Sequence, residues 1–151
     1  MSLTLKQKLH QQCIQYVDQR ILNIRSVLNN ATESANDETK SSAGDKHETG
    51  RAMAQLEQEK GAKQLSEALN LRNELLKIDP EKSSLVVSKG SVVITNEGNF
   101  YISIAAGKIM IENDIYFAIS PESPLASNIA GLLKTQSVSF NNKQYTILSI
   151  L

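Results

Sequence analysis

Residues 17–35, in the first half of the chain, read VDQRILNIRSVLNNATESA. Apolar or small residues recur here at intervals of four, three, four, three and four, and they are Val17, Ile21, Ile24, Leu28, Ala31 and Ala35. This alternation is typical of a coiled-coil seam, in which one face of a helix packs against a partner helix. The pattern predicts one long helix over about residues 4–39, roughly 54 Å at 1.5 Å per residue.

A short polar segment, residues 39–45 (TKSSAGD), interrupts this pattern. Gly44 can adopt the backbone conformations that a chain reversal needs. A second helical pattern covers about residues 45–78, or roughly 50 Å. It ends before Pro80, because proline disfavours helical geometry in the residue that precedes it. Two helices of nearly equal length joined by so short a turn are predicted to lie antiparallel.

The second helix has a looser seam than the first. We predict its buried positions to be Met53, Leu56, Gly61, Leu65, Ala68 or Leu69, Arg72, and Leu75 or Leu76. Alanine and glycine allow the helices to approach closely, but they bury little apolar area. The hairpin is therefore expected to be only marginally stable near its turn.

The second half of the chain changes to a period of two residues, which is typical of strands. The predicted strands cover residues 85–87, 91–95, 100–104, 108–111, 115–119, 137–140 and 144–150. One helix over residues 125–133 is expected, with Ser123 as its cap and Pro124 at its first position. These patterns predict an α+β fold. A coiled-coil helical hairpin (residues 1–79) precedes a small, mainly antiparallel sheet domain with one helix (residues 80–151).

The charges balance overall, with 16 Lys and Arg against 16 Asp and Glu, which argues against wholesale electrostatic binding to nucleic acid or membrane. The imbalance is local. Residues 33–48 carry five acids against two bases, whereas residues 6–25 carry four bases against one acid. The predicted hairpin therefore has an acidic turn and a more basic opposite end.

The composition excludes several classes of site. Cys13 is the one cysteine, so neither an intramolecular disulfide nor a cysteine-rich zinc site can form, and we predict it to be a small core residue. Apolar runs fall short of the roughly 18 residues of a membrane span, and no signal peptide is recognisable, so a cytoplasmic protein is expected. Both histidines, His10 and His47, lie in the hairpin, and the second half shows no catalytic set.

Three segments resemble the GreA/GreB family of transcript cleavage factors of bacterial RNA polymerase. Residues 32–38 (TESANDE) and 47–51 (HETGR) are similar to the acidic segment that enters the family's hairpin turn and the Glu-Gly-Arg segment that leaves it. Residues 117–126 (FAISPESPLA) are similar to the strand and Ser-Pro helix of the family's C-terminal domain. Within the family, the chain looks most like Gre-like proteins of the Bacteroidetes type.

The resemblance implies an accessory factor rather than an enzyme. Its C-terminal domain would have an FKBP-like fold and dock at the rim of the polymerase secondary channel, where Arg51, Ser123, Pro124 and Leu125 are the candidate contacts. Acids at the hairpin turn would help hold a Mg²⁺ shared with the polymerase active site, and nascent RNA would be the indirect target. The candidate acids are Glu33, Asp37, Glu38 and Asp45. Such a factor has no cofactor of its own, and its oligomeric state is left open.

The chain departs from the family pattern at the turn. Cleavage-competent members carry an Asp and a Glu three residues apart; Glu33 matches the Glu, but Asn30 or Ala31 stands where the Asp is expected. Three hypotheses therefore remain. The protein stimulates transcript cleavage, or it occupies the channel as a regulator without cleavage, or it is a coiled-coil adaptor unrelated to polymerase. The adaptor hypothesis predicts an exposed apolar stripe along the hairpin.

Overall fold

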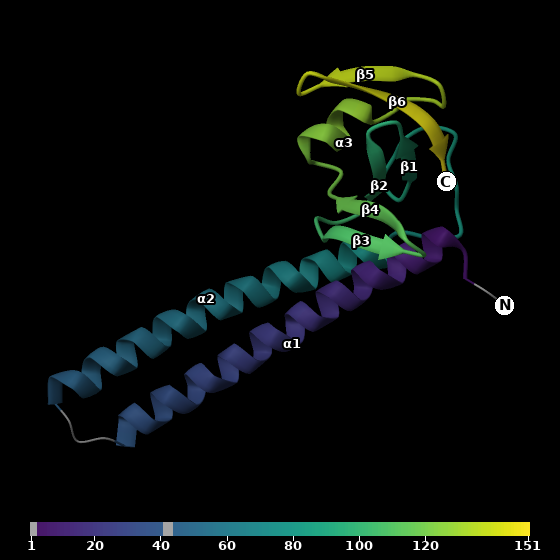
Figure 1. Ribbon diagram of the computed structural model, residues 1–151. Helices are drawn as coiled ribbons and strands as arrows, with labels where there is room; N and C mark the ends of the chain where they lie inside the picture. The colour runs from purple at the N-terminus through teal and green to yellow at the C-terminus, as the bar shows by residue number, and fades with distance from the viewer. Residues whose placement is uncertain (1–2, 41–43) are drawn as a thin grey trace. The chain divides into compact units, whose positions relative to one another are not determined.

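Two long helices open the chain, α1 (Leu5–Lys40) and α2 (Gly44–Leu76) (Figure 1). The computed structural model describes residues 3–40 and 44–151, with side chains described outside residues 31–49. The chain divides into two compact units. The sheet unit consists of the chain up to Tyr16 together with Asn73–Leu151, and the hairpin unit is Val17–Arg72.

The hairpin unit contains α1 from Val17 to its end and α2 up to Arg72. Two contacts define the pairing of the two helices. The Arg72 Nε lies 2.8 Å from the Asp18 Oδ1, and a Cβ added to Gly61 would lie 2.6 Å from the Leu28 Cδ2. Between these contacts α1 advances ten residues while α2 goes back eleven, so the helices are antiparallel and stay in register.

The seam of α1 is confirmed where side chains are described, but the predicted seam of α2 is partly wrong. Val17, Ile21 and Ile24 are buried, whereas Met53 and Leu56 are exposed. From residue 50 onward, where its side chains are described, the buried positions of α2 recur every seven residues and are Ala54, Gly61, Ala68 and Leu75. Small residues can occupy this seam because α1 supplies the bulk, with Leu28 filling the space over Gly61.

The strands of the described chain form one sheet in the order β3-β4-β2-β1-β6-β5. Their bounds are β1 (Val92–Thr95), β2 (Gly98–Ile102), β3 (Gly107–Ile111), β4 (Asp114–Ile119), β5 (Ser137–Phe140) and β6 (Lys143–Ile150). Strands β2 and β4 pair in parallel, and the other neighbours pair antiparallel. With α3 (Pro124–Ile129), this arrangement confirms the predicted α+β class.

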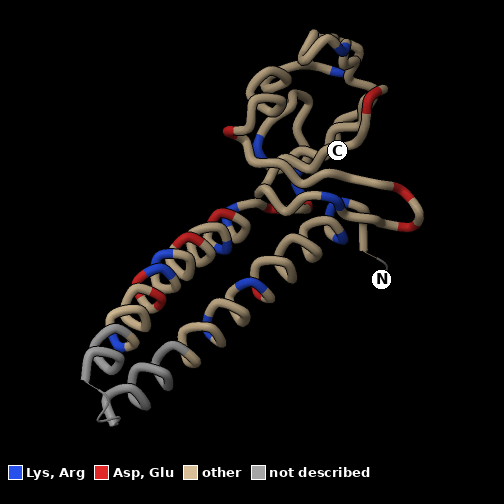
Figure 2. Tube along the Cα trace, turned by 60° about the vertical axis from the view of Figure 1, so that its left-hand side comes forward, with Lys and Arg blue, Asp and Glu red and all other residues tan. Residues whose placement is uncertain are grey.

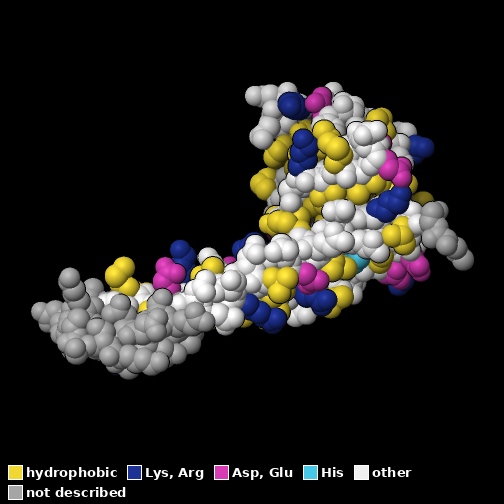
Figure 3. Space-filling view, turned by 60° about the horizontal axis from the view of Figure 1, so that its bottom comes forward, with side chains coloured by type: hydrophobic (Ala, Val, Ile, Leu, Met, Phe, Trp, Pro, Cys, Tyr) yellow, Lys and Arg dark blue, Asp and Glu magenta, His cyan; other side chains and the backbone are white. Residues whose placement is uncertain are grey.

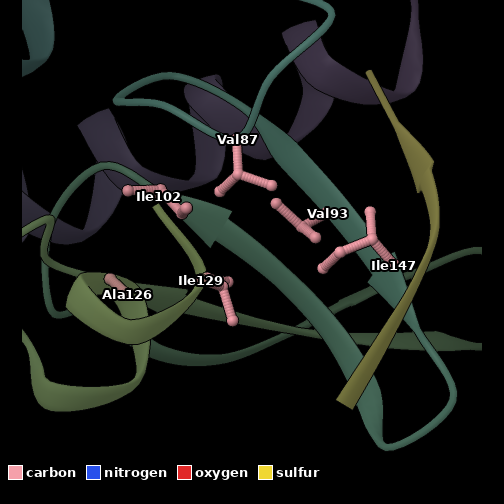
Figure 4. Close-up of a cluster of buried hydrophobic side chains, with 6 residues drawn as sticks. All are labelled: Val87, Val93, Ile102, Ala126, Ile129 and Ile147. Carbon is pink, nitrogen blue, oxygen red and sulfur yellow. The ribbon is translucent and has the colours of Figure 1, made fainter. Parts of the chain in front are cut away.

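Each face of the sheet packs over part of its area against another element of the sheet unit. One face packs against α3 in a cluster of Val87, Val93, Ile102, Ala126, Ile129 and Ile147 (Figure 4). Alternation along β2 directs Tyr101 to the opposite face. There its hydroxyl lies 2.7 Å from the Nδ1 of His10 in α1, and beyond the strand Ser103 Oγ lies 3.6 Å from the Cys13 Sγ. The first turns of α1 are therefore part of the core of this unit.

The predicted strand at residues 85–87 and the predicted length of the helix after Pro124 are wrong for a shared reason. The helix ends at Ile129, and Gly131 follows with a φ of 81°. The Gly131 N–H then donates to the Val87 carbonyl, and the Val87 N–H donates to the Leu132 carbonyl. Because residues 131–133 leave the helix to pair with residues 86–87, each segment forms one isolated bridge rather than part of a ladder.

Candidate functional site

The candidate acids gather at the turn of the hairpin. Glu33, Asp37 and Glu38 lie within the last two turns of α1, and Asp45 lies in the first turn of α2. Positions 33 and 37 are one helical turn apart. The side chains of all four acids are outside the described residues, so their convergence on a shared metal ion stays a prediction.

The described surface of the hairpin unit mixes charges of both signs. Figure 2 shows Lys and Arg interspersed with Asp and Glu along α2, and Arg51, a candidate docking residue, is exposed there. The large apolar side chains exposed among the described residues of the unit are Leu22, Val27, Met53, Leu56 and Leu69. Leu22 and Val27 are five residues apart and so lie on different faces of α1. On the side in view, Figure 3 shows such side chains as separate spots interrupted by charges.

The Ser-Pro helix has the predicted cap. Ser123 is extended (φ −63°, ψ 151°), and its Oγ accepts from the Ala126 N–H at 3.3 Å while donating to the Ser120 carbonyl at 2.8 Å. Its hydroxyl is thus committed to local structure. Pro124 is exposed and Leu125 half-buried, so these two docking candidates present surface that a partner can contact.

An exposed apolar patch lies on the paired strands β3 and β4, where Met110 is the direct neighbour of Ile115 and Phe117 follows two residues later. Phe117 is 40% exposed and Met110 57% exposed, whereas Tyr116, which points to the other face, is buried. We call Met110, Ile115 and Phe117 the β3–β4 patch. Met110 and Ile115 are not among the residues predicted from the sequence, although strict alternation along both strands places them on one face with Phe117.

Burial lowers the pKa of His10 in the α1 interface and raises the pKa of the Cys13 thiol to about 11. Burial also raises the pKa of Tyr101, so the three groups stay uncharged near neutral pH. Cys13 is fully buried and unreactive in this setting, as predicted for a core residue. These groups hold α1 to the sheet and offer no nucleophile to a substrate.

Among the described residues, no group of three or more His, Cys, Asp or Glu side chains is placed to hold a metal ion. Nor does any helix in the described part of the chain have the length and apolar character needed to cross a membrane.

No protein-family model matches the sequence, and no curated protein matches it. A solved structure described as that of the transcription factor Gfh1 is similar over 91% of this chain and 92% of its own, with 16% sequence identity and a TM-score of 0.35. That TM-score lies below the level at which two chains share one fold, so the match carries no weight for function.

Proposed function

We propose that this protein is a Gre-type accessory factor that binds the secondary channel of bacterial RNA polymerase. The proposal rests on the resemblance at both ends of the hairpin turn and at the Ser-Pro helix. Its most specific form, a member of the Bacteroidetes-type group, rests on the sequence alone.

The observation that carries the proposal is the hairpin itself. Its helices of 36 and 33 residues are antiparallel and in register, so a pair of helices roughly 50 Å long carries its acidic segment at one end. A narrow element with carboxylates at its turn suits delivery of metal ligands to an enclosed active site. The mixed charge on its described surface suits passage through an aqueous channel.

The acids at the turn would supply oxygen ligands to a metal ion that belongs to the polymerase. Mg²⁺ prefers hard carboxylate oxygens, so Glu33, Asp37, Glu38 and Asp45 form a fitting donor set. In two-metal sites such an ion stabilises the attacking and leaving oxygens of phosphodiester hydrolysis. This chain would hold and orient the ion, and the polymerase would remain the enzyme.

A second function, channel occupancy without cleavage, is favoured by one observation. Asn30 or Ala31 stands where cleavage-competent relatives carry an Asp, which leaves Glu33 without its usual partner. A factor of this kind would modulate initiation or pausing by filling the channel. The adaptor hypothesis is weaker, because the exposed apolar residues of the described hairpin form no continuous stripe.

The decisive experiment measures transcript cleavage by a backtracked elongation complex of the cognate polymerase in Mg²⁺, with and without this protein. Glu33→Ala, and Asp37→Ala combined with Glu38→Ala, test the acids, and Glu57→Ala on the described part of α2 is the matched control. Faster cleavage that one acid variant abolishes and the control retains supports the cleavage function. Competition with an established secondary-channel factor without cleavage supports the second function, and neither effect refutes both.

Docking can be tested separately on the β3–β4 patch, which we propose as part of the surface that contacts the polymerase. Phe117→Ser should weaken binding of the protein to polymerase while leaving its fold intact, because the side chain is already 40% exposed. Leu148→Ser on β6 is the control, since Leu148 is similarly exposed (48%) and β6 is not a neighbour of β3 or β4. Equal loss in both variants would contradict a specific docking role.

A further inference from the structure

A cavity of about 360 Å³ lies within the sheet unit, where the first turn of α1, the end of α2 and the segment leading to β1 meet. Most of its lining residues carry ammonium or hydroxyl groups. We call it the lysine–serine pocket, and it is lined by Lys6, Lys77, Ile78, Asp79, Lys82, Ser83, Ser84, Ser88, Lys89, Gly90 and Ser91. This composition differs from the apolar lining of an ordinary small-molecule site.

The pocket is strongly basic in a chain whose overall charge is zero. Its lining has four lysines and one carboxylate, that of Asp79. Lys77 and Lys89 both pair with Glu74, which holds the pKa of that carboxyl below its usual range, chiefly through the hydrogen bond from Lys89. Lys82 forms no ion pair with any carboxylate of the described chain. Even with Glu74 counted, positive charge is in excess.

Lys6 is the most unusual member of the lining. Lys6 is only 8% exposed, and its Nζ donates to the backbone carbonyl of Lys82 and, at 3.2 Å, to a main-chain oxygen of Leu151. It forms no ion pair with an Asp or Glu side chain of the described residues. Burial lowers the pKa of Lys6, and the more distant charge of Asp79 opposes this only in part. A buried ammonium with no Asp or Glu side chain paired to it is costly, and an anion bound in the pocket would lower that cost.

The hydroxyls complete the donor set. Ser88 and Ser91 place their Oγ atoms 3.4 Å apart at the wall, and Ser83 and Ser84 follow Lys82 directly. Gly90 has a φ of 91°, which strains other residues, and a Cβ there would lie 3.1 Å from the Cγ2 of Ile78, so glycine suits the close approach of this loop to the segment that follows α2. Ammonium and hydroxyl donors around one cavity match the tetrahedral, multiply charged oxygens of phosphate.

We propose that the lysine–serine pocket binds a small ligand through a phosphate or pyrophosphate group. The excess charge of the pocket suits an anion of two or more negative charges better than a monocarboxylate. The cavity also has room for a group beyond the phosphate itself. This proposal does not depend on the polymerase hypothesis, since the residues involved are remote in sequence from the hairpin turn.

Isothermal titration calorimetry of the full chain with inorganic pyrophosphate tests the proposal. We expect saturable binding of one ligand per chain that weakens as salt is added. Lys82→Gln should weaken binding about tenfold, because a hydrogen-bonded charge contact contributes on the order of 1.5 kcal/mol or more. Lys82 is exposed and only its backbone carbonyl contacts Lys6, so the variant should fold normally. Lys143→Gln, which removes an exposed lysine outside the pocket, should bind as the parent does.

A variant that is expected to strengthen pyrophosphate binding makes the test more specific. Asp79→Asn removes the only lining carboxylate but keeps the oxygen that accepts from the Glu81 N–H at 2.9 Å. It should tighten pyrophosphate binding about threefold, since like-charge repulsion is lost. A general fault in folding would weaken binding in every variant and could not produce this gain.

Competing ligands identify the source of the phosphate and can overturn the proposal. Tighter binding of a nucleoside diphosphate than of pyrophosphate would identify a nucleotide, and equal binding would identify the free inorganic anion. Sulfate or citrate binding as tightly as pyrophosphate would refute a phosphate site. No saturable binding at millimolar pyrophosphate, or equal weakening by Lys82→Gln and Lys143→Gln, would also refute it.

Discussion

At the scale of single residues, the contact between His10 and Tyr101 shows how the interior handles polar groups. Both side chains are buried, and the Nδ1 of His10 lies 2.7 Å from the Tyr101 hydroxyl oxygen, so the two groups form a hydrogen bond. Because burial disfavours the imidazolium, the pKa of His10 is lowered from its ordinary value of 6.5. The free energy of unfolding therefore depends on pH through the His10 side chain.

We predict that the free energy of unfolding falls as the pH drops below about 6.5, since the unfolded chain then binds a proton at His10 that the folded chain does not. Above that pH both states are neutral at His10 and its contribution is constant. Urea unfolding at pH 7.5 and 5.5 measures the effect. His10→Asn, which can still hydrogen-bond to the Tyr101 hydroxyl, should reduce the difference between the two pH values. An unchanged difference would contradict the assignment.

The cap of α3 depends on one hydroxyl. Ser123→Ala should lower the free energy of unfolding by about 1 kcal/mol, because the Ala126 N–H loses its acceptor. Ser127→Ala, on the exposed side of the same helix, should change stability by less than about 0.5 kcal/mol. Chemical denaturation of the two variants side by side checks the prediction, and equal losses would argue against the capping role.

At the scale of elements, the two helices of the hairpin divide their roles by side-chain size. Helix α1 presents Val17, Ile21, Ile24 and Leu28, whereas α2 presents Ala54, Gly61 and Ala68 at intervals of seven residues. A repeat of seven is slightly shorter than two turns of a straight helix, so the buried stripe drifts around α2 unless the pair supercoils with a left hand. The small residues of α2 thus contribute to packing by letting the backbone of α2 approach α1 closely, rather than by filling space with large side chains.

Gly61→Leu should destabilise the hairpin by about 1–3 kcal/mol, because a Cβ at this position already lies 2.6 Å from the Leu28 Cδ2. Ala62→Leu is the matched control, since it enlarges the neighbouring residue on the exposed side of the same helix. Thermal unfolding followed by helical circular dichroism measures both. Gly61→Leu in a Leu28→Ala background should recover part of the loss, and failure to do so would contradict a direct clash.

At the scale of the whole molecule, the two compact units differ in how much apolar surface they bury. The sheet unit has a core of large side chains between α1, the sheet and α3, including Leu9, Tyr101 and Ile129. The described α2 side of the hairpin unit buries mainly alanine and glycine. Because hydrophobic stabilisation scales with buried apolar area, the units are expected to differ in local stability.

Native-state hydrogen exchange should reveal this difference. Amides of α2 between residues 52 and 70 should exchange by local opening at a lower free energy than those of β1, β2 and β6, which should require global unfolding. The measurement is a denaturant series of exchange rates followed by mass spectrometry. One common opening free energy for both sets would contradict the prediction and show a single cooperative unit.

Local sequence patterns were sufficient for most elements of this fold. The four-three spacing of residues 17–28 predicted α1. Gly44 and Pro80 predicted where α2 begins and ends, and Ser123 with Pro124 predicted the start of α3. These features depend on contacts within a few residues, where helical periodicity and backbone preferences act directly. The local excess of acids at the hairpin turn was likewise visible in the sequence, although the arrangement of those side chains stays a prediction.

Features that depend on a distant partner were decided by the tertiary structure. Periodicity alone favoured the larger Met53 and Leu56 for the α2 seam, but the bulk of α1 and the contact between Leu28 and Gly61 place small residues there instead. Residues 85–87 form a single bridge because residues 131–133 leave α3 to meet them. The lysine–serine pocket joins Lys6 to residues more than seventy positions later. Sequence patterns record the preferences of neighbours, whereas packing between distant segments depends on which surfaces the folded chain brings into contact.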